Sequence, residues 1–229
     1  MKNRLQAFFS RIFGQQTEQI SDISEFFRIR MINEQLINRS ITGKRTIGAI
    51  SNVPRHLFTQ YHGVEESYSD SPLQIGYGQT ISQPYIVALM SEQFEELPRG
   101  SRILEIGSGS GYQTAILVQM GFEVHSVEIV HDLFIRSKRA LSDLGLEPTE
   151  MVCSDARLEV SDSLRFNGII SAACAEEIPE IWLEKLEIGG ILVTPTGEKG
   201  NQKLVRIEKS EDGNISEVEI CSVRFVPLK

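Results

Sequence analysis

The sequence lacks an apolar run long enough to span a bilayer, and no signal-peptide core follows its start. Its 229 residues include only three cysteines and four histidines. Cys153, Cys174 and Cys221 lie too far apart in sequence to form a metal-binding pair, and free thiols are typical of a reducing compartment. We therefore expect a cytoplasmic protein without a bound metal and without stable membrane insertion.

The sequence also has fewer basic than acidic residues, with 23 Lys and Arg residues and 31 Asp and Glu residues. The resulting net charge of −8 gives no general attraction to nucleic acid, so no nucleic-acid partner is expected. Hydrophobic residues make up 41% of the chain, which is enough for a sizeable core. The length fits one large α/β domain with a small appendage.

The most informative motif is a glycine turn at residues 107–111, where three glycines alternate with serines after the apolar segment 102–106. Glycine permits a tight turn and lets a ligand approach the backbone amides. The dinucleotide fingerprint Gly-x-Gly-x-x-Gly would need glycine at position 112, where Tyr112 stands. Glu105 would repel a phosphate but attract a cation. The motif therefore favours S-adenosylmethionine, which carries an ammonium and a sulfonium, although a glycine turn without a ligand remains possible.

A second acid supports an adenosine-type ligand. Residues 123–128 have the pattern of the next strand, and Glu128 ends it. Sheets of this kind place an acid at this spacing on the ribose hydroxyls. The alternative is a solvated acid at a strand end.

The rest of the chain alternates helical and strand patterns. Expected helices cover residues 24–38, 44–51, 84–94, 112–120, 131–145 and 178–187, and Ser24 is expected to cap the first. Expected strands cover residues 102–106, 123–128, 149–154, 166–172, 190–195, 203–210 and 215–228. The segment between the second and third helices, residues 59–82, is expected to be a functional loop.

This order predicts the α/β, Rossmann-like fold of class I methyltransferases. That fold has a seven-stranded, mostly parallel sheet with helices on both faces and an antiparallel C-terminal hairpin. We expect one domain at residues 24–229, with a helical and substrate-loop region at 24–95 and a donor-binding core at 96–229.

Residues 1–23 are expected to be an amphipathic extension and linker. Five apolar residues share one helical face near the start: Leu5, Phe8, Phe9, Ile12 and Phe13. The only charges in residues 1–14 are basic. Docking on protein, either back onto its own domain or on a partner, is favoured over membrane contact, because three cations anchor weakly. Self-association through residues 1–14 also remains open. An organellar address also remains open.

Several methylation chemistries lack their residues here. The loop at residues 171–176 has neither the prolines nor the aromatic residue that base amino methylation uses. Cys174 follows alanine instead of the proline typical of cytosine methylation, so we expect a packed thiol. The histidines are scattered singly and are expected to be structural or exposed: His56, His62, His125 and His131.

From about Phe27 to Leu228 the chain resembles the protein-L-isoaspartate (D-aspartate) O-methyltransferase family. The resemblance rests on blocks at residues 53–58, 68–73, 75–84, 104–111, 176–179 and 223–228. The most specific block is Thr80-Ile81-Ser82, which most class I methyltransferases lack.

The resemblance implies methyl transfer from S-adenosylmethionine, giving S-adenosylhomocysteine, to the free carboxylate of isoaspartyl and D-aspartyl residues in damaged proteins and peptides. The ester would then collapse to a succinimide and allow repair. Such a carboxylate is already ionised at neutral pH, so no general base is needed. Ser82 matches the family's active-site serine, and it could also cap the following helix.

The same resemblance implies two sets of binding residues. The donor set is Gln79, Thr80, Ile81, Ser82, Glu105, Gly107, Ser108, Gly109, Glu128, Ile129, Asp155 and Ala156. The substrate set is Ser82, Val223 and Phe225.

The chain also departs from the family pattern. Ser154-Asp155-Ala156 stands where the family has Gly-Asp-Gly, and Asn167 stands where aspartate is usual. These departures leave open two alternatives: a specialised peptide aspartate O-methyltransferase, and a non-catalytic donor-binding damage sensor or adaptor.

Overall fold

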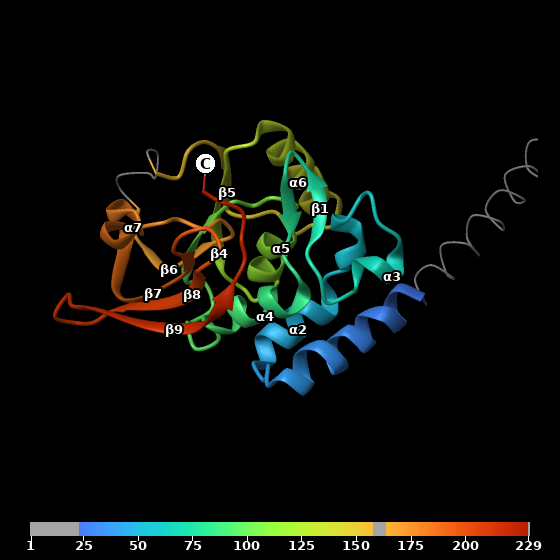
Figure 1. Ribbon diagram of the computed structural model, residues 1–229, viewed down its shortest axis with the longest axis horizontal. Coiled ribbons are helices and arrows are strands. Elements are labelled where there is room, and N and C mark those ends of the chain that lie inside the picture. The colour runs from blue at the N-terminus through green and yellow to red at the C-terminus, as the bar shows by residue number, and fades with distance from the viewer. Residues whose placement is uncertain (1–22, 158–163, 229) are drawn as a thin grey trace, which may run out of the picture.

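A sheet of seven strands in the order β5-β4-β3-β6-β7-β8-β9 is the frame of the molecule (Figure 1). The computed structural model describes residues 23–157 and 164–228. The first five strands in this order are parallel, and β8 and β9 continue the sheet antiparallel to their neighbours. The strands are β3 (Arg102–Ile106), β4 (Glu123–Glu128), β5 (Glu150–Cys153), β6 (Phe166–Ser171), β7 (Leu186–Thr196), β8 (Gln202–Lys209) and β9 (Ile215–Val223). The predicted class I methyltransferase sheet is confirmed.

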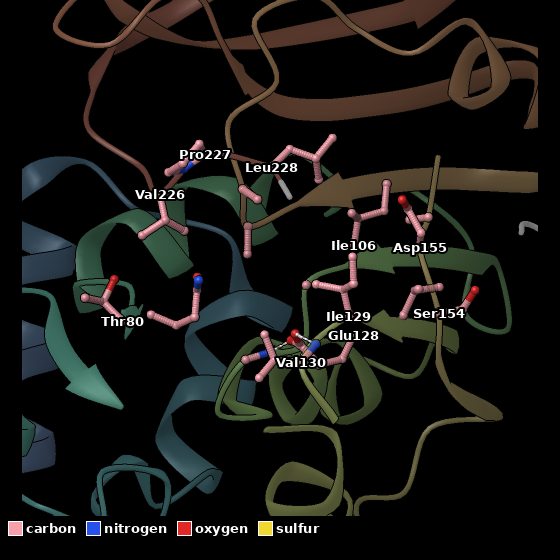
Figure 2. A pocket seen from close by; sticks show the side chains of 17 residues that line it. Thr80, Ile106, Glu128, Ile129, Val130, Ser154, Asp155, Val226, Pro227 and Leu228 are labelled. Carbon is pink, nitrogen blue, oxygen red and sulfur yellow. Dashed lines mark hydrogen bonds between the residues drawn. The ribbon is translucent and has the colours of Figure 1, made fainter. Parts of the chain in front are cut away.

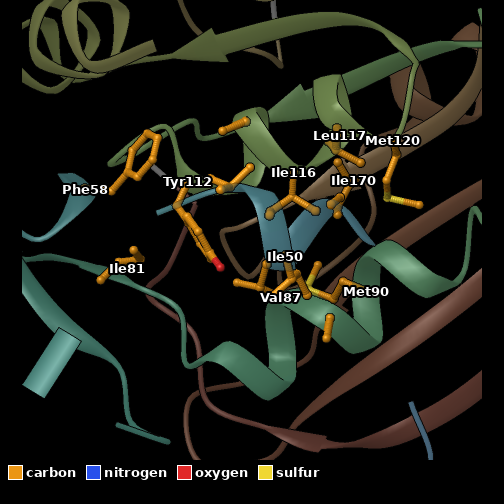
Figure 3. Close-up of a cluster of buried hydrophobic side chains, with 14 of the residues drawn as sticks. Ile50, Phe58, Ile81, Val87, Met90, Tyr112, Ile116, Leu117, Met120 and Ile170 are labelled. Atoms are coloured by element: carbon orange, nitrogen blue, oxygen red, sulfur yellow. The ribbon is translucent and has the colours of Figure 1, made fainter. Parts of the chain in front are cut away.

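Helices pack on both faces of this sheet. They are the helical residues 23–31 continued by η1 (Ile32–Leu36) and η2 (Ile37–Arg39), then α2 (Lys44–Asn52), η3 (Arg55–Phe58), α3 (Val64–Ser67), α4 (Pro84–Glu92), α5 (Tyr112–Gln119), α6 (His131–Asp143) and α7 (Glu180–Lys185). The larger core lies under α2, α4, α5 and α6, and a smaller core lies on the opposite face beneath Trp182 of α7. Figure 3 shows part of the larger core, where Ile50 of α2, Val87 of α4 and Ile116 of α5 meet.

The central strand β3 explains how the sheet separates these cores. Side chains alternate between the faces of a strand, so Ile103 enters the larger core while Leu104 and Ile106 enter the smaller one. Glu105 points to the same face as Ile103 and is fully buried. A lone carboxylate therefore lies in the middle of the sheet, one residue before the strand ends.

The predicted loop at residues 59–82 is wrong in part, because it contains α3 and a hairpin of β1 (Leu73–Gly76) and β2 (Gln79–Ile81). The hairpin turns through Gly76, Tyr77 and Gly78, whose φ angles are 90°, 56° and 71°. This left-handed backbone suits glycine and gives the sequence its loop-like composition. The Tyr77 hydroxyl donates to Asp132 at 2.6 Å, which docks the turn on α6.

Two predicted helix boundaries also shift. Ile23 is already helical, so Ser24 lies inside the first helix and does not cap it. That helix ends through η1 and η2 at Ser40, whose φ is 67°. The predicted helix at 178–187 is shorter because Leu186 already pairs with Phe166 as part of β7.

The apolar segment at residues 1–14 lies outside the described residues. Within the described ranges, no helix has the length and apolarity that crossing a membrane would require.

Candidate functional site

Three adjoining hollows lie at the carboxyl edge of the parallel strands, where α/β sheets bind their ligands. The first cavity runs from Thr80 at one end to Asp155 at the other (Figure 2). The second cavity lies over Glu105 and Tyr112. The third is an open groove beside the C-terminal segment that follows β9. All three are lined by Thr80 and Ala172, so they form one continuous site.

Every residue predicted for the site lines one of these hollows. The first cavity takes Gln79, Thr80, Gly107, Gly109, Glu128, Ile129, Asp155 and Ala156. The second takes Thr80, Ile81, Ser82, Glu105, Ser108 and Gly109. The groove takes Thr80, Ser82, Val223 and Phe225.

The glycine turn lies between the first two cavities, and Gly109 lines both of them. The φ angles of Gly107, Gly109 and Gly111 are 83°, 52° and 89°, a conformation that side chains rarely adopt. A Cβ at Gly111 would lie 3.1 Å from the Ser137 side chain and 3.3 Å from Leu141. Gly111 is therefore needed both for its backbone angle and for the packing of α6 against the turn.

Glu128 ties the end of β4 to the glycine turn. Its Oε2 accepts a hydrogen bond from the Gly109 amide at 2.8 Å, and its Oε1 accepts one from the Val130 amide at 2.9 Å (Figure 2). Each carboxylate oxygen can accept a further hydrogen bond, and the side chain lines the first cavity. The side chain can therefore accept hydrogen bonds from a diol while it holds the turn.

Glu105 is fully buried and only half satisfied. Its Oε2 accepts hydrogen bonds from the hydroxyls of Thr114 at 2.5 Å and Ser126 at 2.7 Å. Its Oε1 has no partner in the described part of the chain. Burial raises the pKa of Glu105 to about 7, although the two hydroxyls act to lower it. A buried acceptor without a donor is costly, and an ammonium group entering the second cavity would satisfy it.

Asp155 faces the first cavity, but its carboxylate is paired with Arg157. Arg157 donates to Asp155 from Nε at 3.0 Å, from Nη2 at 2.7 Å and from its backbone amide at 2.9 Å. Hydrogen bonding and the charge of this arginine lower the pKa of Asp155. An Asp155 contact with adenine would share a carboxylate that Arg157 already orients.

Ala156 is buried beside the same cavity. Its carbonyl accepts a hydrogen bond from the Trp182 indole at 3.2 Å, and it belongs to the smaller core. The methyl group that replaces the family's glycine is therefore packed.

Ser82 lies where the second cavity meets the groove. Its hydroxyl makes no hydrogen bond to the residues that the structure describes, and its carbonyl accepts one from Arg55 Nη2 at 2.8 Å. The expected capping role is wrong, because Gln83 is the N-cap of α4 and no side chain caps that helix. The hydroxyl is therefore available to a ligand.

The C-terminal segment forms the far wall of the groove and part of the first cavity. The backbone of Cys174 pairs with Val226 and Leu228 through two hydrogen bonds of 2.8 Å. Gln202 Oε1 accepts a hydrogen bond from the Phe225 amide at 2.6 Å. These long-range bonds place residues 226–228 in the wall of the first cavity, which Ala172 also lines. Sequence reasoning did not predict these residues for that cavity. The only signal was the resemblance of residues 223–228 to the family.

The histidines and cysteines lie outside the three hollows, apart from Cys221 in the groove wall. Burial raises the pKa of the Cys174 thiol, which lies 3.4 Å from the Gly197 carbonyl and is packed as expected. In residues 23–157 and 164–228, no three His, Cys, Asp or Glu side chains are grouped to hold a metal ion.

Comparison with known proteins gives one consistent family. The profile described as "Protein-L-isoaspartate(D-aspartate) O-methyltransferase" matches residues 28–229. The chain is 43% identical over 201 residues to the protein-L-isoaspartate O-methyltransferase of Geobacter metallireducens, covering 88% of this chain and 93% of that protein. It is 42% identical to the enzyme of the same name from Trichlorobacter lovleyi, with 88% and 92% covered.

A solved structure with the same description has a similar fold. A Plasmodium falciparum protein, described as a protein-L-isoaspartate O-methyltransferase in complex with S-adenosyl-L-homocysteine, superposes with a TM-score of 0.75 at 28% identity. The match covers 86% of this chain and 95% of that one.

Proposed function

The chain belongs to the protein-L-isoaspartate(D-aspartate) O-methyltransferase family, and on this premise we propose how its site methylates the free carboxylate of isoaspartyl residues. The methyl donor is S-adenosylmethionine and the product is S-adenosylhomocysteine. The substrates are proteins and peptides that carry isoaspartyl or D-aspartyl residues. The methyl ester closes to a succinimide, which reopens in part to normal aspartate.

The donor fits the residues that are present. The unpartnered Oε1 of Glu105 would accept the donor's ammonium, and Glu128 would accept its ribose hydroxyls. Gln79, Thr80 and Ile81 come from the hairpin and would cover it. When bound, the donor supplies an electrophilic methyl group on a sulfonium.

The substrate carboxylate needs orientation more than activation. It is ionised at neutral pH, so no residue of the site has to remove a proton. The free Ser82 hydroxyl would donate a hydrogen bond to one carboxylate oxygen and hold it at the junction of the groove and the second cavity. Apolar walls from Ile81 and Val226 would exclude water from a weak nucleophile.

One observation carries this assignment: a free serine hydroxyl lies between a peptide-sized groove and a cavity that contains an unsatisfied buried carboxylate. The test is transfer of tritium from labelled donor to isoaspartyl, aspartyl and asparaginyl versions of one peptide. Label should enter the isoaspartyl peptide alone and should be released by mild base. Equal labelling of the aspartyl peptide would instead identify a specialised aspartate O-methyltransferase. Binding of the donor product without any turnover would identify a sensor.

We also assign the enzyme to the cytoplasm. Support comes from its free thiols at Cys153, Cys174 and Cys221.

A further inference from the structure

Arg55 is a fully buried cation directly behind Ser82. Its Nε donates to the Ser67 carbonyl at 2.8 Å, and its Nη2 donates to the Ser82 carbonyl at the same distance. The guanidinium carbon lies 4.9 Å from the centre of the Tyr112 ring. Arg55 therefore joins α3, the active-site serine and the first residue of α5.

This charge is not neutralised by the residues around it. No carboxylate in the described ranges forms an ion pair with Arg55, and Asp70 pairs with Arg39 at 2.7 Å. Arg55 Nη1 and the Tyr112 hydroxyl are both buried and interact only with each other, because neither has a further hydrogen-bond partner in the described residues. Burial lowers the pKa of Arg55 to about 10, so the group stays charged at neutral pH. A buried charge without a counter-ion is costly, and an incoming anion would relieve that cost.

The site described above brings such an anion to Ser82. We propose that Arg55 is a positioning residue for the substrate carboxylate: it fixes the main chain of Ser82 and supplies a standing positive charge behind the carboxylate. This inference rests on the proposed function, and it names the positive charge that would attract the substrate carboxylate. Tyr112 contacts the Arg55 guanidinium and also lines the second cavity, so its ring lies between this charge and the site.

The charge of Arg55 should affect substrate binding more than the chemical step. Methyl transfer neutralises the carboxylate, so a fixed positive charge stabilises the bound substrate at least as strongly as the transition state. Loss of the charge should therefore raise KM for the peptide and leave kcat nearly unchanged. A merely structural role would alter kcat and donor binding as well.

The test compares Arg55→Met, which removes the charge, with Arg55→Lys, which keeps it. We expect Arg55→Met to raise KM for an isoaspartyl peptide by about tenfold or more, with kcat changed by less than about threefold. Arg55→Lys should restore KM to within about threefold of the parent. Calorimetry should show nearly unchanged affinity for S-adenosylhomocysteine in both variants.

Arg45 provides the matched control. It also donates to main-chain carbonyls, those of Glu95 at 2.9 Å and Met120 at 2.8 Å, and its guanidinium carbon lies 4.6 Å from the centre of the Phe122 ring. Neither arginine lines the three hollows, but the carbonyls that Arg45 contacts belong to residues outside them, whereas Arg55 contacts Ser82. Arg45→Met should lower the melting temperature without changing KM.

A second measurement uses the parent protein and does not depend on the variants folding. Saturated with S-adenosylhomocysteine, it should bind an isoaspartyl peptide at least about tenfold more tightly than the same peptide with a neutral carboxamide in place of the free carboxylate. Equal affinity for the two peptides, or an unchanged KM in Arg55→Met, would overturn the proposal. If the parent protein methylates no isoaspartyl peptide, the proposed function itself fails.

Discussion

At Glu105 a carboxylate is buried in the centre of the sheet, and at Ser82 a hydroxyl is left free at the mouth of the groove. The unpaired oxygen of Glu105 is unusual, because polar groups in the interior of a protein are normally paired, whereas Ser82 is only partly buried. Glu105 lacks a partner for one oxygen, and Ser82 donates to none of the described residues. Ser82 is assigned to the substrate carboxylate and Glu105 to the donor's ammonium group, so their variants should have different effects.

Ser82→Ala should slow turnover while donor binding stays nearly intact. The lost hydrogen bond to a charged carboxylate is worth about 1.5–3 kcal/mol, or about ten- to hundredfold in kcat/KM. Steady-state rates and calorimetry with S-adenosylhomocysteine separate the two effects. Glu128→Ala is the matched comparison and should weaken donor binding, because it removes the ribose acceptor and the bond to Gly109. Normal donor affinity in Glu128→Ala would refute the ribose assignment.

Glu105 should make donor binding pH-dependent. Its pKa is raised to about 7 by burial, so the acid is largely protonated below that pH and cannot attract an ammonium. Between pH 7 and pH 5, affinity for S-adenosylhomocysteine should fall, approaching about tenfold per pH unit. Calorimetry across this range should show the fall in the parent and a flat, weaker profile in Glu105→Gln. Identical profiles would show that Glu105 does not hold the ammonium.

The stability effect of Glu105 has the opposite sign. Its folded-state pKa lies above the ordinary value of 4.5, so folding favours the protonated acid. The ligand-free protein should therefore lose stability from this group as pH rises from about 4.5 to 7. Glu105→Gln should remove that loss in thermal melts.

Among the elements, the β1–β2 hairpin was not predicted, because its amino-acid composition is typical of a loop. Its turn of Gly76, Tyr77 and Gly78 looks like a loop in sequence, yet it presents Gln79 and Thr80 to the donor cavity. The hairpin is held to α6 by the Tyr77 hydroxyl on Asp132 and by Arg136, which donates to the Ile75 carbonyl. Its position thus depends on contacts with a distant helix, which local patterns do not predict.

Releasing this tether should loosen the cover of the donor. Tyr77→Phe removes the hydroxyl that Asp132 accepts, and we expect severalfold weaker binding of S-adenosylhomocysteine with little change in melting temperature. Asp132→Asn keeps an acceptor and should have a smaller effect. Unchanged affinity in both variants would show that the hairpin holds its position without the tether.

The loop after β5 carries the main departure from the family. Ala156 is buried in the smaller core and also lines the first cavity. Ala156→Gly should leave donor binding unchanged or tighter, and it should cost about 1 kcal/mol of stability through lost burial and added backbone freedom. A large loss of donor affinity would show that the pocket depends on alanine.

For the whole molecule, the parallel core was predictable because its strands and glycine turn have strong local signatures. The positions of Glu105 and Glu128 followed from the ends of β3 and β4. The pairing of residues 226–228 with Cys174 and the burial of Arg55 were not predictable, because they join segments far apart in the chain. The pairing of Asp155 with Arg157 was missed for another reason: two neighbouring charges do not show in sequence which one faces the ligand.

The N-terminal segment bears on association of the whole molecule. Exposed apolar side chains recur every three residues along the first described helix, at Ile23, Phe26 and Ile29. The sequence has five further apolar residues within 1–14, so we expect this end of the chain to take part in association. Deleting residues 1–17 should preserve folding and turnover but change self-association or partner binding, measured by light scattering. Loss of activity would place the segment in the domain core, and identical monomeric behaviour of both forms would refute the association.

The most direct test of the central claim is to follow one isoaspartyl peptide through the reaction by mass spectrometry, with a deuterated methyl donor. The account predicts that the peptide first gains one labelled methyl group, then loses it as methanol to form the succinimide. With repeated cycles the normal aspartyl peptide should accumulate, and Ser82→Ala should slow the first step. A stable methylated peptide, or equal methylation of the aspartyl form, would contradict the account.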